Sequence, residues 1–298
     1  MNALIIIITG ALVASSCSIL GSFLILRKMA MVSDAISHAV LPGIVIAFLL
    51  GSDIDSLWML AGAGAVGLLT TFLIEFFHQK GRLQTDASIG VTFTWLFALG
   101  VILLSYYAGD AHIDEACVLY GEIAYVPLDL IELDSGAILG PKALIVLLFI
   151  LMVNLVFVTL GYKELKITTF DPSFARSVGI SPSAWHYALM SLVSLTTVGS
   201  FESVGAILVV ALIVTPPATA YLMTQDLTRM LVLAVSFGIS SSILGYFLAY
   251  VLDGSISGAM ATVAGLQFAV VFIAVKQRNR AIIRQGTAPP LEATKVLH

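Results

Sequence analysis

The sequence predicts an all-α polytopic membrane protein with about eight or nine transmembrane helices, and three observations carry this prediction. Hydrophobic residues make up 59% of the 298 residues and charged residues only 11%, and the mean hydropathy is +1.04. A soluble domain carries about 25% charged residues, so this composition indicates lipid as the solvent. Apolar runs near the roughly 20 residues needed to cross a bilayer recur along the chain. The third observation is the one-sided placement of Lys and Arg.

The candidate spans follow one another with no polar domain between them. They are residues 3–26, 32–51, 57–77, 87–107, 141–161, 185–200, 203–223, 230–251 and 259–275. The two that meet near Gly199–Ser203 are short and are also compatible with one broken element. We therefore expect one transmembrane domain over residues 1–280, followed by a polar cytoplasmic tail over residues 281–298.

The cationic residues predict the orientation, because Lys and Arg remain on the cytoplasmic side of a membrane. With the N-terminus outside, all 14 Lys and Arg residues except Lys142 fall inside. The loop 108–140 then falls outside and carries His112 and several acids but no Lys or Arg. Such a loop either attracts cations to the mouth of a path or is simply solvated.

The stretch "MVSDAISHAVLPG" opens the second span with two ionisable residues. Asp34 and His38 are four residues apart and therefore share one face of a helix. Ionisable residues inside a membrane are rare and usually functional. An imidazole and a carboxylate without a thiolate suit Mn²⁺, Fe²⁺ or Zn²⁺. The pair is thus a candidate metal site, with a buried ion pair and a proton relay as alternatives.

The neighbouring residues of this stretch predict its packing. Ala35, Ala39 and Gly43 form an edge of small residues that allows a second helix to approach closely. Pro42 has no backbone N–H, so it leaves the His38 carbonyl without its helical partner. We therefore expect a kink just beyond the Asp–His pair, with that carbonyl as a possible third ligand.

Glu202 is a second candidate ligand, between the spans 185–200 and 203–223. A water-exposed acid at the membrane interface is the equal alternative. Pro216 and Pro217 interrupt the apolar run after it, which is typical of a bent helix along a path.

The inner loop contains a short amphipathic helix over residues 171–179. Asp171 is suited to the N-cap and Pro172 to the first helical position, and Gly179 ends the helix. Phe174, Ala175 and Val178 would form its apolar face. This helix either lies on the lipid surface or docks into a groove of a soluble partner.

Several function classes are excluded or disfavoured. A net charge of −4 without a basic patch argues against nucleic acid as a partner. The sequence has no GxxxxGK[ST], so it does not bind ATP through a P-loop of its own. The sequence contains neither HExxH nor GxSxG, so it has no catalytic motif that would favour an enzyme acting inside the membrane. We expect no permanently bound cofactor.

Three stretches, in this order, resemble the permease subunit of bacterial ABC importers for manganese, zinc or iron: "RKMAMVSDAISHAVLPG", "TTFDPSFARSVGI" and "VGAILVVALIVTPPATAYL". The resemblance covers roughly residues 1–280. It implies the ABC importer permease fold of the metal-ion type, in the plasma (inner) membrane of a bacterium. It also implies three kinds of partner: a second permease copy or paralogue, cytoplasmic ATPase subunits, and an extracytoplasmic metal-binding protein.

The resemblance also assigns residues. Asp34 and His38 match the family's metal-path pair, and the segment Asp171 to Gly179 matches the coupling helix that contacts the ATPase. The position of Glu202 varies in the family, so Glu202 remains a tentative ligand that would distinguish the metal. The implied function is ATP-driven import of a divalent metal, with Mn²⁺ favoured over Zn²⁺ or Fe²⁺. A proton-coupled secondary transporter using Asp34 and His38 as a proton relay is the alternative.

Overall fold

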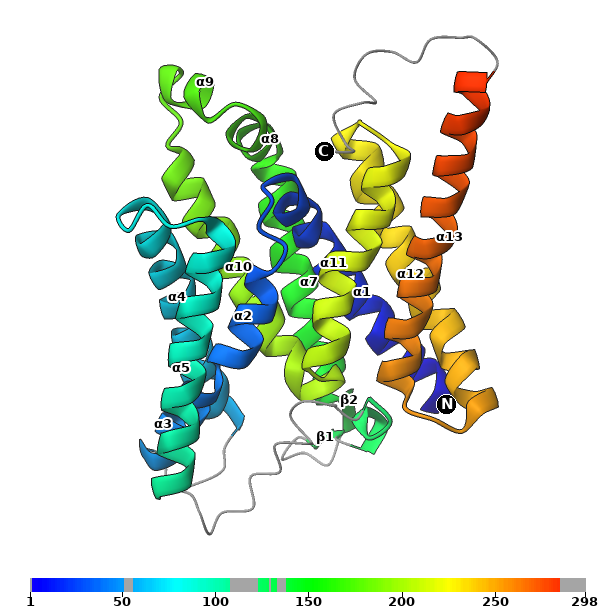
Figure 1. Cartoon of the computed structure of the whole chain (residues 1–298). Coiled ribbons are helices and arrows are strands. Elements are labelled where there is room, and N and C mark those ends of the chain that lie inside the picture. Colours follow the sequence, from blue (N-terminus) through cyan, green and yellow to red (C-terminus); the bar gives the residue numbers. More distant parts are fainter. Residues whose placement is uncertain (1, 51–55, 108–122, 129, 133–137, 285–298) are drawn as a thin grey trace.

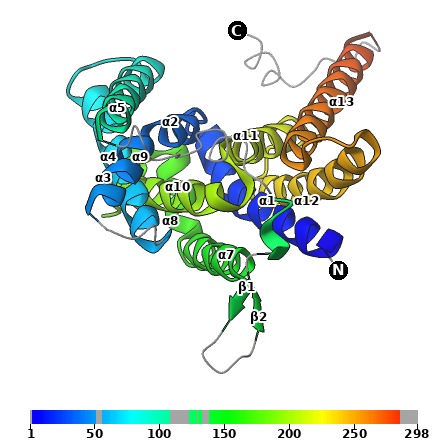
Figure 2. The same ribbon diagram turned by 90° about the horizontal axis from the view of Figure 1, so that it is seen from below.

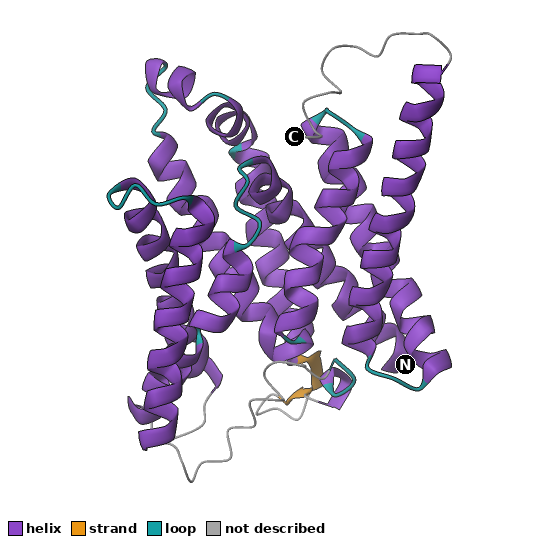
Figure 3. Cartoon of the chain, viewed as in Figure 1, coloured by secondary structure: helices purple, strands orange, loops and turns teal. Residues whose placement is uncertain are grey.

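Helices make up almost all of the chain that the computed structural model describes (Figures 1 and 3). The described residues are 2–50, 56–107, 123–128, 130–132 and 138–284. The helices are α1 (Asn2–Leu26), α2 (Val32–Ala39), α3 (Leu41–Leu50), α4 (Ser56–Gln79), α5 (Thr85–Tyr107), α7 (Lys142–Leu160), α8 (Tyr162–Phe170), α9 (Pro172–Ser177), α10 (Pro182–Val204), α11 (Ala206–Met223), α12 (Leu227–Leu252) and α13 (Ile256–Arg284).

The described part of the segment between α5 and α7 contains structure that the sequence did not predict. A short 3-10 helix, η1 (Val126–Leu128), precedes two strands, β1 (Leu130–Glu132) and β2 (Ile138–Pro141). The strands pair antiparallel, with Leu130 opposite Pro141. His112 and most of the acids of this loop lie outside the described residues, as does the tail from residue 285 onward.

Helix α1 forms the centre of the bundle. It packs against α7, α10, α11 and α12, and Figure 2 shows it between the helices of both sides. Its apolar side chains are buried along most of its length, among them Val13, Leu20 and Phe23. This burial explains why α1 is apolar all round rather than on one stripe.

Helices α2 to α5 form a group on one side of this centre, and α12 and α13 lie on the other side (Figures 1 and 2). The first group is joined to the rest mainly through α10, which packs against both α2 and α4. Helices α12 and α13 pack against each other and against α11. The α2 helix therefore lies beside the helix that links the two sides of the molecule.

Among the described residues, six helices are long and apolar enough to cross a membrane: α1, α5, α7, α11, α12 and α13. Shorter apolar helical stretches cover Val32–Ala47 and Gly62–His78. The all-helical membrane fold is thus confirmed, whereas the expected eight or nine spans are confirmed only in part. Helix α10 is not among the six, and its buried Ser and Thr residues make it less apolar.

The predicted end of the span 185–200 is wrong. Helix α10 continues to Val204, and the break follows at Gly205, which has a φ of 78°. Gly199 lies inside the helix, where a Cβ atom would collide with the Ile150 side chain. This glycine therefore provides close packing against α7 and does not end the helix.

Successive long helices run in opposite directions, and this places the cationic turns at one end of the bundle. The ends of α1, α4 and α11 lie near α8 and α9, whereas β1 and β2 lie at the opposite end (Figure 1). Lys142 begins α7 at that opposite end.

Candidate functional site

Helix α2 holds Asp34 and His38 one turn apart. The Nε2 atom of His38 lies 3.6 Å from Oδ1 of Asp34, and the two side chains are 39% and 36% exposed, respectively. The other face of α2, with Val32, Ser33 and Ile36, is buried. The helix is therefore held by one face while the carboxylate and the imidazole remain accessible on the other.

The His38 ring lies against two aromatic rings of α5. Its centroid is 5.9 Å from that of Phe93, in a tilted arrangement, and 6.0 Å from that of Phe97, edge to face. Sequence reasoning did not single out these two residues, although their i, i+4 spacing places them on one face of the span 87–107. They limit the orientations that the imidazole can adopt.

The expected break beyond the pair is present. Helix α2 ends at Ala39, α3 begins at Leu41, and the amides of Gly43 and Ile44 both bond to the carbonyl of Val40. Pro42 itself packs against Gly100 of α5, where a Cβ atom would lie 2.7 Å from the proline Cδ. The interruption thus falls at Val40, two residues beyond His38, as the missing N–H of Pro42 predicts.

The predicted small-residue edge is also present. Ala35, Ala39 and Gly43 are buried. A Cβ atom on Gly43 would collide with the backbone carbonyl of Gly62 in α4, and a Cβ atom on Gly62 would reach 2.6 Å from the carbonyl of Gly43. The two glycines therefore let α3 and α4 approach backbone to backbone.

The Asp34–His38 geometry suits a shared cation. Oδ1 and Nε2 are 3.6 Å apart. An ion at about 2.1 Å from each of these atoms would make an Oδ1–ion–Nε2 angle of roughly 120°. Among the described residues, Asp34 has no Lys or Arg within ion-pair distance, so no fixed positive charge competes at this position. No group of three His, Cys, Asp or Glu side chains suited to a metal occurs among the described residues. Two protein ligands with water would hold an ion weakly enough to release it.

Glu202 lies in the last turn of α10. Its side chain is outside the described residues, so its distance to Asp34 and His38 stays untested.

A second histidine–carboxylate pair was missed by the sequence reasoning. Nε2 of His186 in α10 lies 3.1 Å from Oε2 of Glu75 in α4, and both side chains are almost buried. The signal that could have revealed it was Glu75, the single acid within the span 57–77. Unlike the first pair, this one lies next to a cation, because Nη1 of Arg27 is 3.4 Å from Nδ1 of His186.

The short helix expected over residues 171–179 is present as α9. The Asp171 carboxylate accepts a hydrogen bond of 2.9 Å from the amide of Phe174, and Pro172 occupies the first helical position. Gly179 follows the helix with a φ of 81°, which favours glycine. These residues have the capping roles that their sequence predicts.

The expected apolar face of α9 is divided in the structure. Phe174 and Val178 are 52% and 51% exposed, whereas Ala175 is completely buried. Ala175 therefore packs α9 against the rest of the protein. Phe174 and Val178 form an exposed apolar surface.

Comparison with known proteins identifies the family. The ABC 3 transport family matches residues 2–276. The chain is 50% identical over 268 residues to the manganese transport system membrane protein MntD of Bacillus subtilis, covering 90% of each chain. It is 44% identical to the zinc transport system membrane protein TroD of Treponema pallidum, covering 90% of this chain and 72% of TroD.

Among solved structures, the chain is similar to PsaBC from Streptococcus pneumoniae in complex with Fab. The TM-score is 0.73 and the identity 33%, with 91% of this chain and 90% of that chain covered. The expected permease fold is therefore confirmed at the level of the whole chain. This protein is a multi-pass membrane protein that belongs to the ABC 3 transport family.

Proposed function

We propose that this chain is the permease subunit of an ATP-driven importer that moves a divalent transition metal into the cytoplasm by alternating access. The observation that carries the proposal is the Asp34–His38 pair, which is half-exposed on α2 without a competing cation among the described residues. The names of the relatives from Bacillus subtilis and Treponema pallidum refer to manganese and zinc transport. Mn²⁺ is the favoured substrate, with Zn²⁺ and Fe²⁺ as alternatives.

In the proposed path, two side chains of this protein bind the ion and later release it. A hydrated ion entering from the outer side exchanges water for Asp34 Oδ1 and His38 Nε2, and Glu202 is a tentative third ligand. Binding needs a neutral imidazole and an ionised carboxylate. Release needs these ligands to be few in number, since a closed tetrahedral cage would retain the ion.

The proposed topology has nine crossings. Six are the long apolar helices. Of the other three, one is formed by α2 and α3 together, one by α4 and one by α10. The N-terminus is outside and α9 is cytoplasmic, because Lys and Arg are concentrated at the α9 end. The membrane is the plasma (inner) membrane of a bacterium.

The proposed partners follow from the two ends of the bundle. ATPase subunits hydrolyse ATP and contact Phe174 and Val178 of α9, because these apolar side chains are exposed on a capped, rigid helix. An extracytoplasmic metal-binding protein delivers the ion at the end of β1 and β2. A second permease copy or a paralogue completes the membrane unit. Family membership favours this ATP-driven arrangement over the proton-coupled alternative.

The decisive experiment measures Mn²⁺ uptake by the complete transporter in vesicles, with and without ATP. We expect Asp34→Asn and His38→Gln each to lower uptake at least about tenfold, since removing a ligand costs at least as much as removing its supporting residues. Ser37→Ala is the matched control, because the Ser37 hydroxyl on the same helix donates a hydrogen bond to the carbonyl of Ser33 within α2. Normal uptake by an assembled Asp34→Asn transporter would exclude the ligand role, and uptake that persists without ATP would favour the proton relay.

A further inference from the structure

The second histidine–carboxylate pair belongs to a partly buried polar cluster that we call the Arg27 junction, formed by Arg27, Glu75, Thr168, Thr169 and His186. Arg27 donates through Nε to the Thr169 hydroxyl at 3.1 Å and through Nη2 to the Thr168 hydroxyl at 3.2 Å. Its Nη1 lies 3.4 Å from Nδ1 of His186. All three guanidinium nitrogens therefore have partners, on two different helices.

Arg27 contacts the His186 ring from one side. A guanidinium only donates, so Nδ1 of His186 is the acceptor in this contact, and Nε2 lies on the other side of the ring. That Nε2 faces Oε2 of Glu75 at 3.1 Å, within ion-pair distance but without the alignment of a hydrogen bond. The junction thus places the His186 ring between the Arg27 guanidinium and the Glu75 carboxylate.

Burial lowers the pKa of Arg27 to about 10, and the charge of Glu75 opposes that change. Arg27 therefore remains charged at neutral pH. A permanent cation beside the His186 ring would repel a divalent metal, which makes Glu75 and His186 unsuited to a second metal site. A partly buried charge network of this kind is costly to break and holds its members in one geometry.

The backbone next to Arg27 is held by two hydrogen bonds at the end of α1. The amides of Lys28 and Met29 bond to the carbonyls of Ile25 and Leu24, and Lys28 has a φ of 59°. These two bonds form the Schellman motif that ends α1. The following turn leads directly to Val32 at the start of α2, so a displacement of Arg27 is passed to the helix that carries Asp34.

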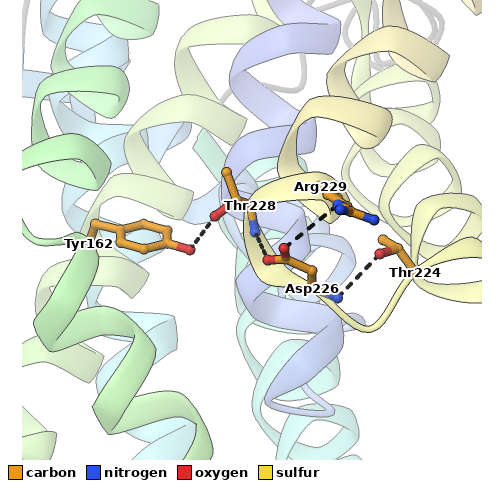
Figure 4. A network of polar contacts seen from close by, with 5 residues as sticks. All are labelled: Tyr162, Thr224, Asp226, Thr228 and Arg229. Carbon is orange, nitrogen blue, oxygen red and sulfur yellow. Dashed lines mark hydrogen bonds and ion pairs between the residues drawn. The ribbon is translucent and has the colours of Figure 1, made fainter.

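The other side of the junction leads to α9. Thr168 and Thr169 lie in the last turn of α8, and Asp171 is both the end of α8 and the N-cap of α9. The first residue of α8, Tyr162, makes a separate contact with α12, because its hydroxyl is 2.7 Å from the Thr228 hydroxyl (Figure 4). The α12 end of that contact is ordered by Asp226, which accepts from the amide of Thr228 at 3.0 Å.

We propose that the Arg27 junction transmits the movement of α9 to the Asp34–His38 helix, so that Arg27, Thr168 and Thr169 are positioning residues for transport. This inference rests on the proposed function, in which α9 receives the movement of the ATPase. The connection runs from α9 through α8 to Arg27 and then through the turn after α1 to α2. Glu75 and His186 hold Arg27 in place from α4 and α10.

The test uses the complete transporter in vesicles and measures ATP hydrolysis and Mn²⁺ uptake together. The main variant carries Thr168→Val and Thr169→Val, which remove the two acceptors but keep the β-branched shape. We expect the Mn²⁺ imported per ATP hydrolysed to fall about fivefold or more, the lower range of a coupling free energy. Assembly, thermal stability and basal ATP hydrolysis should remain close to those of the unaltered protein.

Tyr162→Phe is the matched control, because it removes one hydroxyl contact from the opposite end of α8. It should leave the uptake per ATP unchanged. A second variant, Arg27→Gln, should lower the same ratio, and adding the two valines to it should cause no further loss, since both changes break one connection.

The outcomes separate this inference from the proposed function. Unchanged uptake per ATP in the two-valine variant, or an equal loss in Tyr162→Phe, would overturn the role of the junction. Additive losses in the combined variant would also overturn it. Absence of ATP-dependent uptake by the unaltered complex would instead refute the proposed function itself.

Discussion

At the scale of single residues, the His38 imidazole depends on its aromatic neighbours as well as on Asp34. Phe97 contacts the ring edge to face from α5. Without that contact the imidazole can adopt orientations that point Nε2 away from Asp34, so the ion loses a preorganised ligand.

We therefore predict that Phe97→Leu raises the Mn²⁺ concentration for half-maximal uptake by about two- to tenfold, the range expected from an aromatic contact. The maximal rate should change little, because both ligands remain. Trp95→Leu is the control, since Trp95 lies on the opposite side of α5 and is 55% exposed. An equal effect of both substitutions would indicate a general disturbance of α5 instead of a role at His38.

The site residues that the sequence predicts interact with near neighbours in the chain, whereas those that it did not reveal interact across long sequence separations. Asp34, His38 and Pro42 act within two turns of one helix, so the periodicity of the sequence predicts their arrangement. Glu75 and His186 are far apart in the sequence, and their proximity depends on how α4 packs against α10. A single sequence contains no signal for that packing.

At the scale of elements, backbone contact between α1 and α11 depends on one glycine and one proline. Pro217 cannot donate to the carbonyl of Ile213, its partner in a regular helix. That carbonyl faces Gly21 of α1 so closely that a Cβ atom on Gly21 would overlap it. The contact is consistent with a Cα–H···O bond that satisfies the carbonyl. The Pro216–Pro217 pair, expected from the sequence to line a path, is buried in α11, and Pro217 lies against α1 at Gly21.

We predict that Gly21→Ala separates α1 from α11 and lowers the yield of folded protein, with a cost of about 1–3 kcal/mol for overpacking. The measurement is the midpoint of thermal unfolding of the detergent-solubilised chain. Gly64→Ala is the control, because no atom lies within 4 Å of a Cβ atom at Gly64 in α4. That substitution should leave the midpoint unchanged or raise it slightly, since Ala favours helix over Gly.

Helix α9 presents its apolar surface through Phe174 and Val178. Phe174→Glu should abolish the stimulation of ATP hydrolysis by the metal-loaded binding protein, because an unpaired charge cannot enter an apolar groove without a large desolvation cost. Phe174→Leu should retain most of it. Retained stimulation in Phe174→Glu would count against α9 as the coupling helix. Ala175→Glu is unsuitable for this test, since Ala175 is buried and the substitution would prevent folding.

At the scale of the whole molecule, the sequence predicted which segments are apolar helices better than where those helices end. Runs of apolar residues are determined by the thickness of the bilayer, so nearly every candidate span falls on a described helix. The ends depend on local packing, as Gly199 shows, because a glycine that serves a close contact looks the same in the sequence as one that ends a helix. The strands β1 and β2 were missed because only a few residues form them.

The orientation of the bundle can be tested by labelling single cysteines with a membrane-impermeant maleimide. Cys17 is buried in α1, so replacing Cys117 by Ser gives a background without a reactive thiol. Lys80→Cys then marks the turn after α4, and Tyr125→Cys marks the outer loop, where the side chain is 58% exposed.

We predict that Tyr125→Cys is labelled in right-side-out vesicles and Lys80→Cys only in inside-out vesicles. The reason is the concentration of Lys and Arg at the end that holds α8 and α9, which favours the cytoplasm. Labelling both variants after detergent treatment controls for thiol reactivity. The reverse pattern would place α9 outside the cell, where no ATP-hydrolysing partner could reach Phe174. An import mechanism through Asp34 and His38 would then have to be abandoned, and the Arg27 junction would have no movement to transmit.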